Sequence, residues 1–410
     1  MCMVKKYFFC YNHSAMKILA IETSCDETAI AVLEITGKTT TPKITRLAHS
    51  IASQIELHAQ YGGVFPMMAK REHAKAFTPL LATSLQKAKL LKKTNYPLSE
   101  KLITKIRTTL EREPDMGDAL ITFLSGISQP AIDLIAVTTG PGLEPALWVG
   151  VNAAKALALA WDIPIVGVNH MEGHVLSVLV QEKRKGQKTF TAEKLHFPVL
   201  SLLVSGGHTE LVLMKDWHHY KKIGATRDDA AGEAFDKVAR MLELPYPGGP
   251  KISALAQTQR GKNVIPKEYA LPRPMMMSTD FDFSFSGLKT AVLYLLKKIA
   301  IHTDEIKAHI AHEFENAVVE VLTHKTLRAL KKYQCTTLVV GGGVAGNTHL
   351  RTTLTNTVKK TFPKMKVYFP EKELATDNAF MIGIAGYFEY LKTKKGKRPG
   401  SLRAQGNLSL

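Results

Sequence analysis

Two stretches of the chain share one pattern, in which two apolar segments flank a short polar turn. The first is Lys17–Leu33, with hydroxyls and acids around Asp26, and the second is Val199–Leu213, with its turn at Ser205-Gly206-Gly207. Short apolar runs bounded by such turns predict buried strands. Because the plan occurs twice in 410 residues, a length that suits two lobes better than one core, we expect an internally duplicated architecture.

Further segments alternate between strand and helix patterns. A strand is predicted at Leu134–Leu143, ending in a Gly-Pro-Gly turn, and an alanine-rich helix at Gly150–Trp161. The sequence also predicts a strand at Ile163–Val168, a helix at Asp228–Leu242 and a strand at Thr337–Val340. Strands that alternate with helices in this way indicate an α/β fold.

Two histidines stand four residues apart just after the strand predicted at Ile163–Val168. On a helix, positions i and i+4 share one face, so His170 and His174 can point at one metal ion. The spacing equals that of the zinc ligands in H-E-x-x-H proteases, but Met171 stands where those enzymes have glutamate. The pair therefore predicts a metal site of another kind, and the alternative is a helix with two surface histidines.

A metal of this class needs three or more ligands, so another residue must complete the set. Asp377, in Ala-Thr-Asp-Asn-Ala at the head of a helix-like run, is the candidate. Its carboxylate would complete a set of two histidines and one acid. An N-cap of the following helix is an equally open interpretation of Asp377.

Two glycine-rich turns after predicted strands suit the binding of anions. They are Ser205-Gly206-Gly207 and Gly341-Gly342-Gly343. Glycines at such places let the backbone approach a ligand and leave N–H groups available for a phosphate. Neither turn matches a Walker A loop or a Rossmann fingerprint, and a tight turn without a ligand is the alternative for each. Acids near such loops serve a metal or orient a nucleophile, and the candidates are Asp26, Glu27 and Asp236.

The charge balance indicates a polyanionic partner. The formal net charge is +18. A strongly basic chain is a candidate for binding nucleic acid, and a general solubility bias is the alternative. The basic clusters Lys87–Arg112 and Lys392–Arg403 lack aromatic residues at stacking spacing, so a platform for stacking single strands is not expected.

Cysteine usage and hydropathy indicate a cytoplasmic protein without a membrane partner. Cys2, Cys10, Cys25 and Cys335 show no paired spacing, which favours a reducing compartment over a disulfide scaffold. No apolar run is long enough to span a bilayer. The apolar stretch near the N-terminus is too short for a signal peptide.

Two segments are expected to lie outside the core. Met1–Ala15 precedes a strand that we expect to begin at Met16, and we interpret it as a disordered extension or a misassigned start. Lys92–Ser128 is charged and is interrupted by proline and glycine, so we interpret it as a surface insertion rather than a core element.

Many short motifs appear in one order between Met16 and about Gly386. They are Ile21–Thr28, Tyr61–Pro66, Arg71–His73, Gly140–Leu143, the pair His170 and His174, Leu203–Thr209, Asp228–Lys237, Tyr246–Pro250, Asp282–Thr290 and Ala375–Asn378. With these motifs the chain resembles the bacterial tRNA adenosine threonylcarbamoyltransferase family, formerly labelled O-sialoglycoprotein endopeptidase. It departs from the usual family pattern at Glu144–Trp148 and at Ala345–Asn347.

The resemblance implies a duplicated actin-like, sugar-kinase-like fold of two lobes with a central cleft. We expect the first lobe at residues 16–165 and about 388–410, and the second lobe, with most of the site, at 166–387. The implied activity is an acyltransferase reaction in tRNA modification. A threonylcarbamoyl group passes from threonylcarbamoyl-AMP to N6 of adenosine 37, in tRNAs that read codons beginning with A.

The resemblance also implies roles for particular residues. His170, His174 and Asp377 would hold one divalent metal, iron or zinc. Asp26 and Glu27 would sit near the cleft floor as candidate catalytic residues. The adenylate donor, or an ATP- or ADP-type nucleotide in the same cleft, would contact Leu203, Val204, Ser205, Gly206, Gly207, Asp236, Gly249 and Asn347. The implied partners are tRNA, a paralogous subunit without the metal site (TsaB-like) and a small ATPase (TsaE-like).

Three other functions compete with this interpretation. A metalloprotease would need a glutamate in the place of Met171. An actin-like ATPase or kinase acting on a small molecule does not need the histidine pair. An inactive tRNA-binding scaffold is disfavoured because every matched site position is intact.

Overall fold

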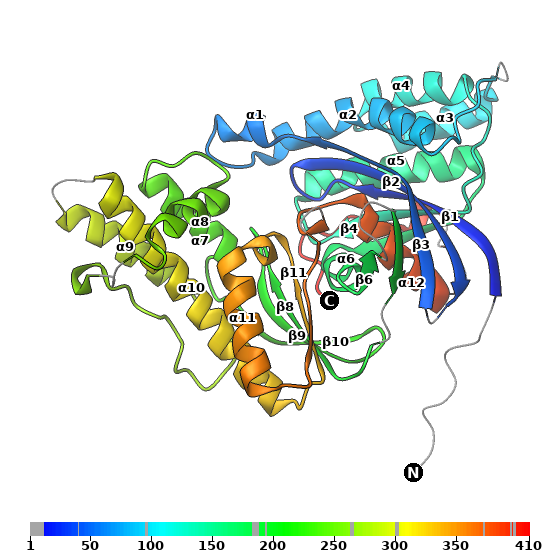
Figure 1. Cartoon of the computed structure of the whole chain (residues 1–410). Coiled ribbons are helices and arrows are strands. Elements are labelled where there is room, and N and C mark those ends of the chain that lie inside the picture. The colour runs from blue at the N-terminus through cyan, green and yellow to red at the C-terminus, as the bar shows by residue number, and fades with distance from the viewer. Residues whose placement is uncertain are drawn as a thin grey trace, which may run out of the picture. The chain divides into compact units, whose positions relative to one another are not determined.

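The computed structural model describes residues 12–39, 41–94, 97–182, 188–192, 195–262, 266–299, 303–371, 374–393, 396 and 399–410. The chain forms two compact units (Figure 1). Unit 1 comprises Met1–Glu56, Val64–Lys194 and Asp377–Ser409, and unit 2 comprises Leu57–Gly63, Leu195–Thr376 and Leu410. None of the described helices combines the length and apolar character needed to cross a bilayer.

Unit 1 contains a seven-stranded sheet in the order β5-β4-β1-β2-β3-β7-β6. Its strands are β1 (Asn12–Glu22), β2 (Glu27–Lys38), β3 (Thr41–Ser53), β4 (Leu134–Gly140), β5 (Ile165–Asn169), β6 (Val180–Glu182) and β7 (Thr189–Ala192). Its helices are α2 (Pro66–Lys87), α3 (Glu100–Thr109), α4 (Pro114–Ser125), α5 (Glu144–Trp161), α6 (His170–Ser177) and α12 (Ala379–Thr393), while α1 (Ile55–Ala59) spans the boundary between the units.

The sheet of unit 1 buries both of its faces. Leu19 and Ile21 of β1 belong to a core that includes side chains of α2 and α5. Successive strand residues point to opposite faces, and Ala20 accordingly packs against Gly383 of α12. This arrangement explains why β1 is apolar in consecutive positions rather than in alternate ones.

Unit 2 contains a five-stranded sheet in the order β10-β9-β8-β11-β12. Its strands are β8 (Val199–Val204), β9 (Thr209–Asp216), β10 (His219–Ala225), β11 (Thr337–Gly341) and β12 (Lys366–Tyr368). Its helices are α7 (Ala231–Met241), α8 (Gly248–Gln259), α9 (Ser286–Lys298), α10 (Asp304–Lys332) and α11 (Thr348–Thr361). Leu200, Leu202 and Val204 of β8 share one core with side chains of α7, α9 and α10.

The two sheets repeat one topology, which confirms the duplicated α/β architecture. In unit 1, β1, β2 and β3 pair antiparallel, β4 runs parallel to β1, and β5 runs parallel to β4. In unit 2, β8, β9 and β10 pair antiparallel, β11 runs parallel to β8, and β12 runs parallel to β11. The strand–turn–strand segments noted in the sequence are β1–β2 and β8–β9.

The unit boundaries differ from those expected from the sequence. The boundaries at 165/166 and 387/388 lie instead at 194/195 and 376/377. The segment after β5 stays in unit 1 because β7, with β6 beside it, pairs with β3. The segment from Asp377 returns to unit 1 because α12 covers its sheet. The histidine pair and Asp377 therefore belong to unit 1, not to the second lobe.

Two expectations about peripheral segments need correction. Strand β1 begins at Asn12 rather than Met16, so part of the expected leader is strand, and residues 1–11 lie outside the described residues. The segment Lys92–Ser128 is not a mere surface insertion, because Ile106 of α3 and Leu120 of α4 are fully buried in the core of unit 1. Apart from the buried Glu113, its charged residues are exposed on or beside two amphipathic helices, which gives the segment its polar composition.

Two predicted helices begin at other residues. The helix expected at Gly150 begins at Glu144, where Pro145 suits the first turn. The helix expected at Asp228 begins at Ala231. The carboxylate of Asp228 instead accepts hydrogen bonds from the backbone N–H groups of Phe285 and Ser286, so this acid belongs to a loop.

Candidate active site

Helix α6 carries the histidine pair directly after β5. Asn169 ends the strand and caps the helix, because its side-chain oxygen accepts the N–H of Met171 at 2.9 Å and that of Glu172 at 3.3 Å. The side chains of His170 and His174 are buried, with residue exposures of 6% and 1%. The alternative of two surface histidines is therefore wrong.

Asp377 joins the two histidines. Its Oδ1 lies 3.2 Å from Nε2 of His170 and 3.1 Å from Nε2 of His174. The potential ligand atoms of the three residues all lie within 4.8 Å of one another. The N-cap role belongs to the next residue, Asn378, whose Oδ1 accepts the N–H of Met381 at 2.9 Å. The carboxylate of Asp377 thus faces the histidines instead of the helix end.

Glu22, the last residue of β1, lies behind His170 and was not singled out as a site residue from the sequence. It is fully buried, and its Oε2 lies 3.1 Å from Nδ1 of His170. The same oxygen accepts the hydroxyl of Thr138 at 2.5 Å, and Oε1 accepts the N–H of Ser24. The only sequence signal is a carboxylate at the end of a strand that is otherwise apolar.

The charges in this group attract one another. Burial alone would lower the pKa of His170, but the carboxylates of Asp377 and Glu22 raise it well above its usual value. Burial opposes the ionisation of Asp377, yet His170 and His174 hold its pKa well below the usual range. Burial also opposes the ionisation of Glu22, and His170 lowers the pKa of that carboxyl. The group therefore favours a positive charge between its acids.

The donor set and its spacing fit a metal ion. Two imidazoles and a carboxylate are ligands typical of iron(II) and zinc. Bonds of about 2.1 Å to one ion separate neighbouring ligand atoms by about 3.0–3.4 Å. The distances of 3.2 and 3.1 Å from Asp377 to the histidines match this separation. Three protein ligands leave positions for a substrate, as catalytic sites do and closed structural sites do not.

Asp26 ends the turn between β1 and β2, and Glu27 is the first residue of β2. His73 of α2 contacts both the turn and the start of this strand. Nδ1 of His73 lies 2.7 Å from the hydroxyl of Thr28, and Nε2 lies 3.0 Å from the carbonyl oxygen of Cys25. Because a carbonyl only accepts, Nε2 carries a proton and donates to Cys25. His73 is fully buried and so ties the turn to the core.

The environment of this turn limits the chemistry of its side chains. Burial, together with Asp26 and Asp377, raises the pKa of Glu27 to about 10. Glu27 therefore keeps its proton at neutral pH, and its carboxyl group acts as a hydrogen-bond donor rather than as a base. Burial and Asp26 also raise the pKa of the Cys25 thiol well above its usual value, which argues against a thiolate nucleophile. Catalytic roles for Asp26 and Glu27 remain predictions.

The two glycine turns meet in unit 2. Strands β8 and β11 are parallel neighbours with Leu203 paired to Gly341, so their carboxyl ends lie at one edge of the sheet. Gly342 has φ of +87°, and a Cβ on it would lie 2.4 Å from the carbonyl oxygen of Val204. Only glycine allows this approach. Leu203 and Val204 are fully buried in β8, so their side chains support the turn that follows the strand.

Around these turns, several glycines face open space. A Cβ built on Gly206, Gly207, Gly249 or Gly343 would meet no described atom within 4 Å. Gly249 lies in the first turn of α8, whose N–H groups suit an anion. Asp236 supports this helix end, because its Oδ1 accepts the N–H of Gly248 at 2.7 Å. The predicted residues Ser205–Gly207, Asp236 and Gly249 therefore lie within one unit, with room for a ligand at the glycines.

Asn347 has structural hydrogen bonds. Its Oδ1 caps α11 by accepting the N–H of Leu350 at 2.8 Å. Its side-chain nitrogen donates to Glu315 at 2.7 Å and to Ser253 at 2.8 Å. A contact of the Asn347 side chain with a donor molecule stays a prediction.

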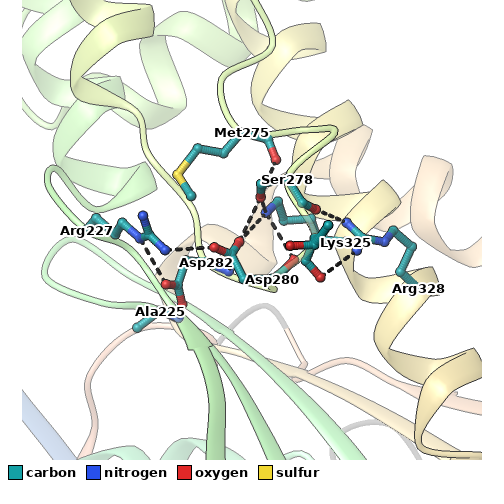
Figure 2. Close-up of polar contacts among 9 residues, drawn as sticks. Ala225, Arg227, Met275, Ser278, Asp280, Asp282, Lys325 and Arg328 are labelled. Carbon is teal, nitrogen blue, oxygen red and sulfur yellow. Dashed lines mark hydrogen bonds and ion pairs between the residues drawn. The ribbon is translucent and has the colours of Figure 1, made fainter.

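A clamp of charged residues holds the segment before α9. Figure 2 shows Arg227 on one side of this segment and Lys325 and Arg328, both from α10, on the other. Arg227 pairs with Asp280 at 2.7 Å, and Lys325, which is fully buried, donates to the hydroxyl of Ser278 at 2.7 Å. The clamp brings the motif Asp282–Thr290 to the start of α7, where the motif Asp228–Lys237 lies. These two motifs are far apart in sequence.

Comparison with known proteins identifies related chains. A family model described as tRNA N6-adenosine threonylcarbamoyltransferase (TsaD) matches residues 45–94 and 116–384. The unmatched residues 95–115 fall inside Lys92–Ser128. A tRNA N6-adenosine threonylcarbamoyltransferase of Staphylococcus epidermidis is 41% identical over 394 residues, which cover 96% of this chain and 97% of the relative. The enzyme of that name from Paraburkholderia xenovorans is 42% identical over 373 residues, covering 90% and 91%.

A solved structure is similar in fold. The crystal structure of full-length HypF in its phosphate- and nucleotide-bound form has a TM-score of 0.50 and 13% sequence identity. The match covers 96% of this chain and 48% of that one. At this identity the likeness concerns the fold alone.

Proposed function

This chain belongs to the tRNA N6-adenosine threonylcarbamoyltransferase family, and we propose that it transfers a threonylcarbamoyl group to tRNA. The donor is threonylcarbamoyl-AMP, and the acceptor is N6 of adenosine 37 in tRNAs that read codons beginning with A. The buried group of His170, His174 and Asp377 carries the proposal. An actin-like ATPase or kinase of small molecules has no need of it, and a zinc protease would need a glutamate where Met171 stands.

His170, His174 and Asp377 would hold one divalent metal, iron(II) or zinc. When bound, the metal would polarise the carbamoyl carbonyl and neutralise charge that develops on its oxygen. Asp377 is the most accessible of the three ligands, with 23% of its side chain exposed against 8% and 2% for the histidines. Substrate would therefore approach the group from the side of this carboxylate.

The reaction needs a balanced exchange of bonds. N6 of adenosine forms a bond to the carbamoyl carbon, the bond from that carbon to the phosphate oxygen breaks, and AMP leaves. The amine loses one proton. An exocyclic adenine amine is a poor nucleophile, so orientation has to supply much of the rate. Glu27 holds a proton near neutral pH, which suits hydrogen-bond donation to an oxygen and argues against its acting as the base.

The glycine loops of unit 2 would bind the adenylate. The backbone N–H groups of Gly206 and Gly207, and the first turn of α8 at Gly249, suit a phosphate. Asp236 supports the latter through its bond to Gly248. The N–H of Ser205 donates to the carbonyl of His208 at 2.8 Å and so shapes the turn. Leu203, Val204 and Asn347 would complete the contacts, and an ATP- or ADP-type nucleotide can use the same loops.

We propose tRNA as the macromolecular substrate, with a paralogous subunit and a small ATPase as partners. The net charge of +18 supports a polyanionic substrate. An anticodon loop presents unstacked bases, which makes the target amine accessible. The free thiols of Cys25 and Cys335 agree with activity in the cytoplasm.

A reconstituted transfer assay tests the proposal. The full chain, with its partner proteins, receives labelled threonine, bicarbonate, ATP, the adenylate-forming enzyme and unmodified tRNA that reads an ANN codon. We expect label on the tRNA with the wild type and with His219→Ala, and none with His174→Ala. His219 is a matched control because it is an exposed histidine paired with an aspartate, Asp216.

Two outcomes would contradict the proposal. Equal transfer by His174→Ala and the wild type would remove the metal group from the mechanism. Absence of label with any partner set, together with turnover of a protein or a small-molecule substrate, would favour the protease or the kinase.

A further inference from the structure

The carboxylate of Glu22 is buried deeply for an ionised group. The residue is fully inaccessible at the end of β1, behind four fully buried apolar residues, Ile18–Ile21. Removing a carboxylate from water costs several kcal/mol unless its oxygens are well satisfied. The contacts of Glu22 should therefore indicate what its burial achieves.

Both oxygens of Glu22 accept hydrogen bonds from fixed donors. Oε1 accepts the backbone N–H of Ser24, and Oε2 accepts the hydroxyl of Thr138 from the neighbouring strand β4 at 2.5 Å. Oε2 also lies 3.1 Å from Nδ1 of His170. Since an ionised carboxylate can only accept, Nδ1 of His170 must be the donor in this contact.

This hydrogen bond decides which ring nitrogen of His170 can bind an ion. With the proton of Nδ1 directed at Glu22, the neutral ring offers the lone pair of Nε2. Nε2 is the atom that lies 3.2 Å from Asp377, on the side of the candidate metal ligands. Carboxylates that orient a ligating histidine in this way raise metal affinity in other sites.

We infer that Glu22 is a positioning residue, which holds His170 with Nδ1 as a donor and Nε2 turned to the metal. The inference rests on the proposed metal-binding function of His170, His174 and Asp377. The competing interpretation is purely structural, because Glu22 also fixes the turn at Ser24 and ties β1 to β4 through Thr138.

Glu22→Gln separates the two interpretations. Glutamine has nearly the same shape and can still accept one hydrogen bond, but its amide nitrogen is a donor. With that nitrogen facing His170, the ring has to present Nδ1 as an acceptor and carry its proton on Nε2, where it blocks the metal. Ser24, whose hydroxyl lies 3.2 Å from the same Nδ1, cannot repair this loss while the introduced amide donates to the ring.

The experiment measures zinc affinity of the full chain by competition with a chromogenic chelator. We expect Glu22→Gln to weaken zinc binding by about 10–100-fold. The control Glu34→Gln should bind as the wild type does, since Glu34 is a partly exposed acid of the same sheet, paired with Lys17. His174→Ala should lose the site. The nitrogen chemical shifts of His170 supply a second readout, because they report which ring nitrogen is protonated.

The outcomes distinguish this inference from the proposed function. If Glu22→Gln kept the zinc affinity and the His170 tautomer of the wild type, while His174→Ala lost zinc, the role of Glu22 would be overturned. The metal group would then still stand. Wild-type affinity in His174→Ala would overturn the metal group itself. If Glu22→Gln does not fold, Glu22→Asp replaces it, and the shorter side chain should weaken zinc binding while wild-type affinity would again overturn the inference.

Discussion

At the scale of single residues, the position of His170 between two carboxylates determines how the metal group responds to pH. Burial would make the ring neutral, but Asp377 and Glu22 raise its pKa well above the usual value. Without a metal, the imidazole therefore holds its second proton up to a higher pH than a free imidazole does. A metal ion needs the neutral ring, so binding has to release that proton.

We predict that metal affinity falls as the pH is lowered. Each displaced proton weakens apparent affinity by up to about tenfold per pH unit below the pKa of His170. Zinc titrations against a chelator between about pH 6 and 8, repeated in two buffers of different ionisation enthalpy, measure affinity and proton release together. An affinity that stays constant over this range, without proton release, would contradict the prediction.

The residues of the metal group differ in how well the sequence alone predicts their roles. His170 and His174 could be predicted because their spacing alone places them on one helical face. Asp377 could be named but not separated from an N-cap, since only the tertiary structure assigns the cap to Asn378. Glu22 could not be found, because nothing local distinguishes a strand-end acid in solvent from one that is buried behind a histidine.

At the scale of elements, helix α2 holds the turn that carries Asp26 together with the start of β2, where Glu27 lies. His73 bonds the carbonyl of Cys25 in the turn and the hydroxyl of Thr28 in β2, so one imidazole links the turn to the strand. These two bonds hold the backbone on either side of Asp26 and Glu27.

We predict that His73→Ala lowers kcat for transfer by about tenfold or more and leaves zinc affinity unchanged. Without the imidazole, the carbonyl of Cys25 and the hydroxyl of Thr28 lose their hydrogen bonds to His73, and the turn loosens. The metal ligands keep their contacts. Thr28→Val, which removes only one of the two bonds, should have a smaller effect. Steady-state kinetics and zinc titration on the same preparations test this, and an equal loss of metal would contradict it.

The segment before α9 is held by a second kind of contact, a buried lysine. Lys325 is fully inaccessible, and its ammonium lies 3.4 Å from Asp280 (Figure 2). The ammonium also lies 5.9 Å from the ring centroid of Phe283. Burial lowers the pKa of Lys325, against the opposing effect of Asp280. Much of what the side chain contributes is therefore packing of its aliphatic stem.

We predict that Lys325→Ala lowers the free energy of unfolding by about 2–4 kcal/mol, and Lys325→Met by about 1 kcal/mol. Alanine leaves a cavity, whereas methionine keeps most of the volume, and Asp280 is exposed enough to regain water. Urea unfolding measures both values. Equal losses in the two variants would assign the stability to the charge, which both remove, instead of to the packing of the stem.

At the scale of the whole molecule, the duplication could be predicted and the unit boundaries could not. The repeated strand–turn–strand pattern is local, and it specifies β1–β2 and β8–β9 directly. The boundaries depend on distant pairings. Strand β7 reaches back to β3, and α12 returns to the first sheet, with Gly383 against Ala20. No pattern within either segment identifies its partner, and so the sequence does not place the metal ligands in unit 1.

The excess of positive charge leads to the last prediction, which concerns tRNA binding. Each phosphate that lysine or arginine neutralises releases counterions, so the logarithm of the affinity falls linearly with the logarithm of salt concentration. With a net charge of +18, this chain should show a steep slope, equivalent to several phosphate contacts.

A small nucleotide provides the internal control. AMP has one phosphate, which we propose is held by backbone N–H groups, so its affinity should change by much less over the same salt range. Fluorescence anisotropy with labelled tRNA, and calorimetry with AMP, from about 50 to 300 mM KCl, measure the two slopes. Equal slopes would mean that the positive charge does not contact the tRNA, and that the basic composition serves solubility alone.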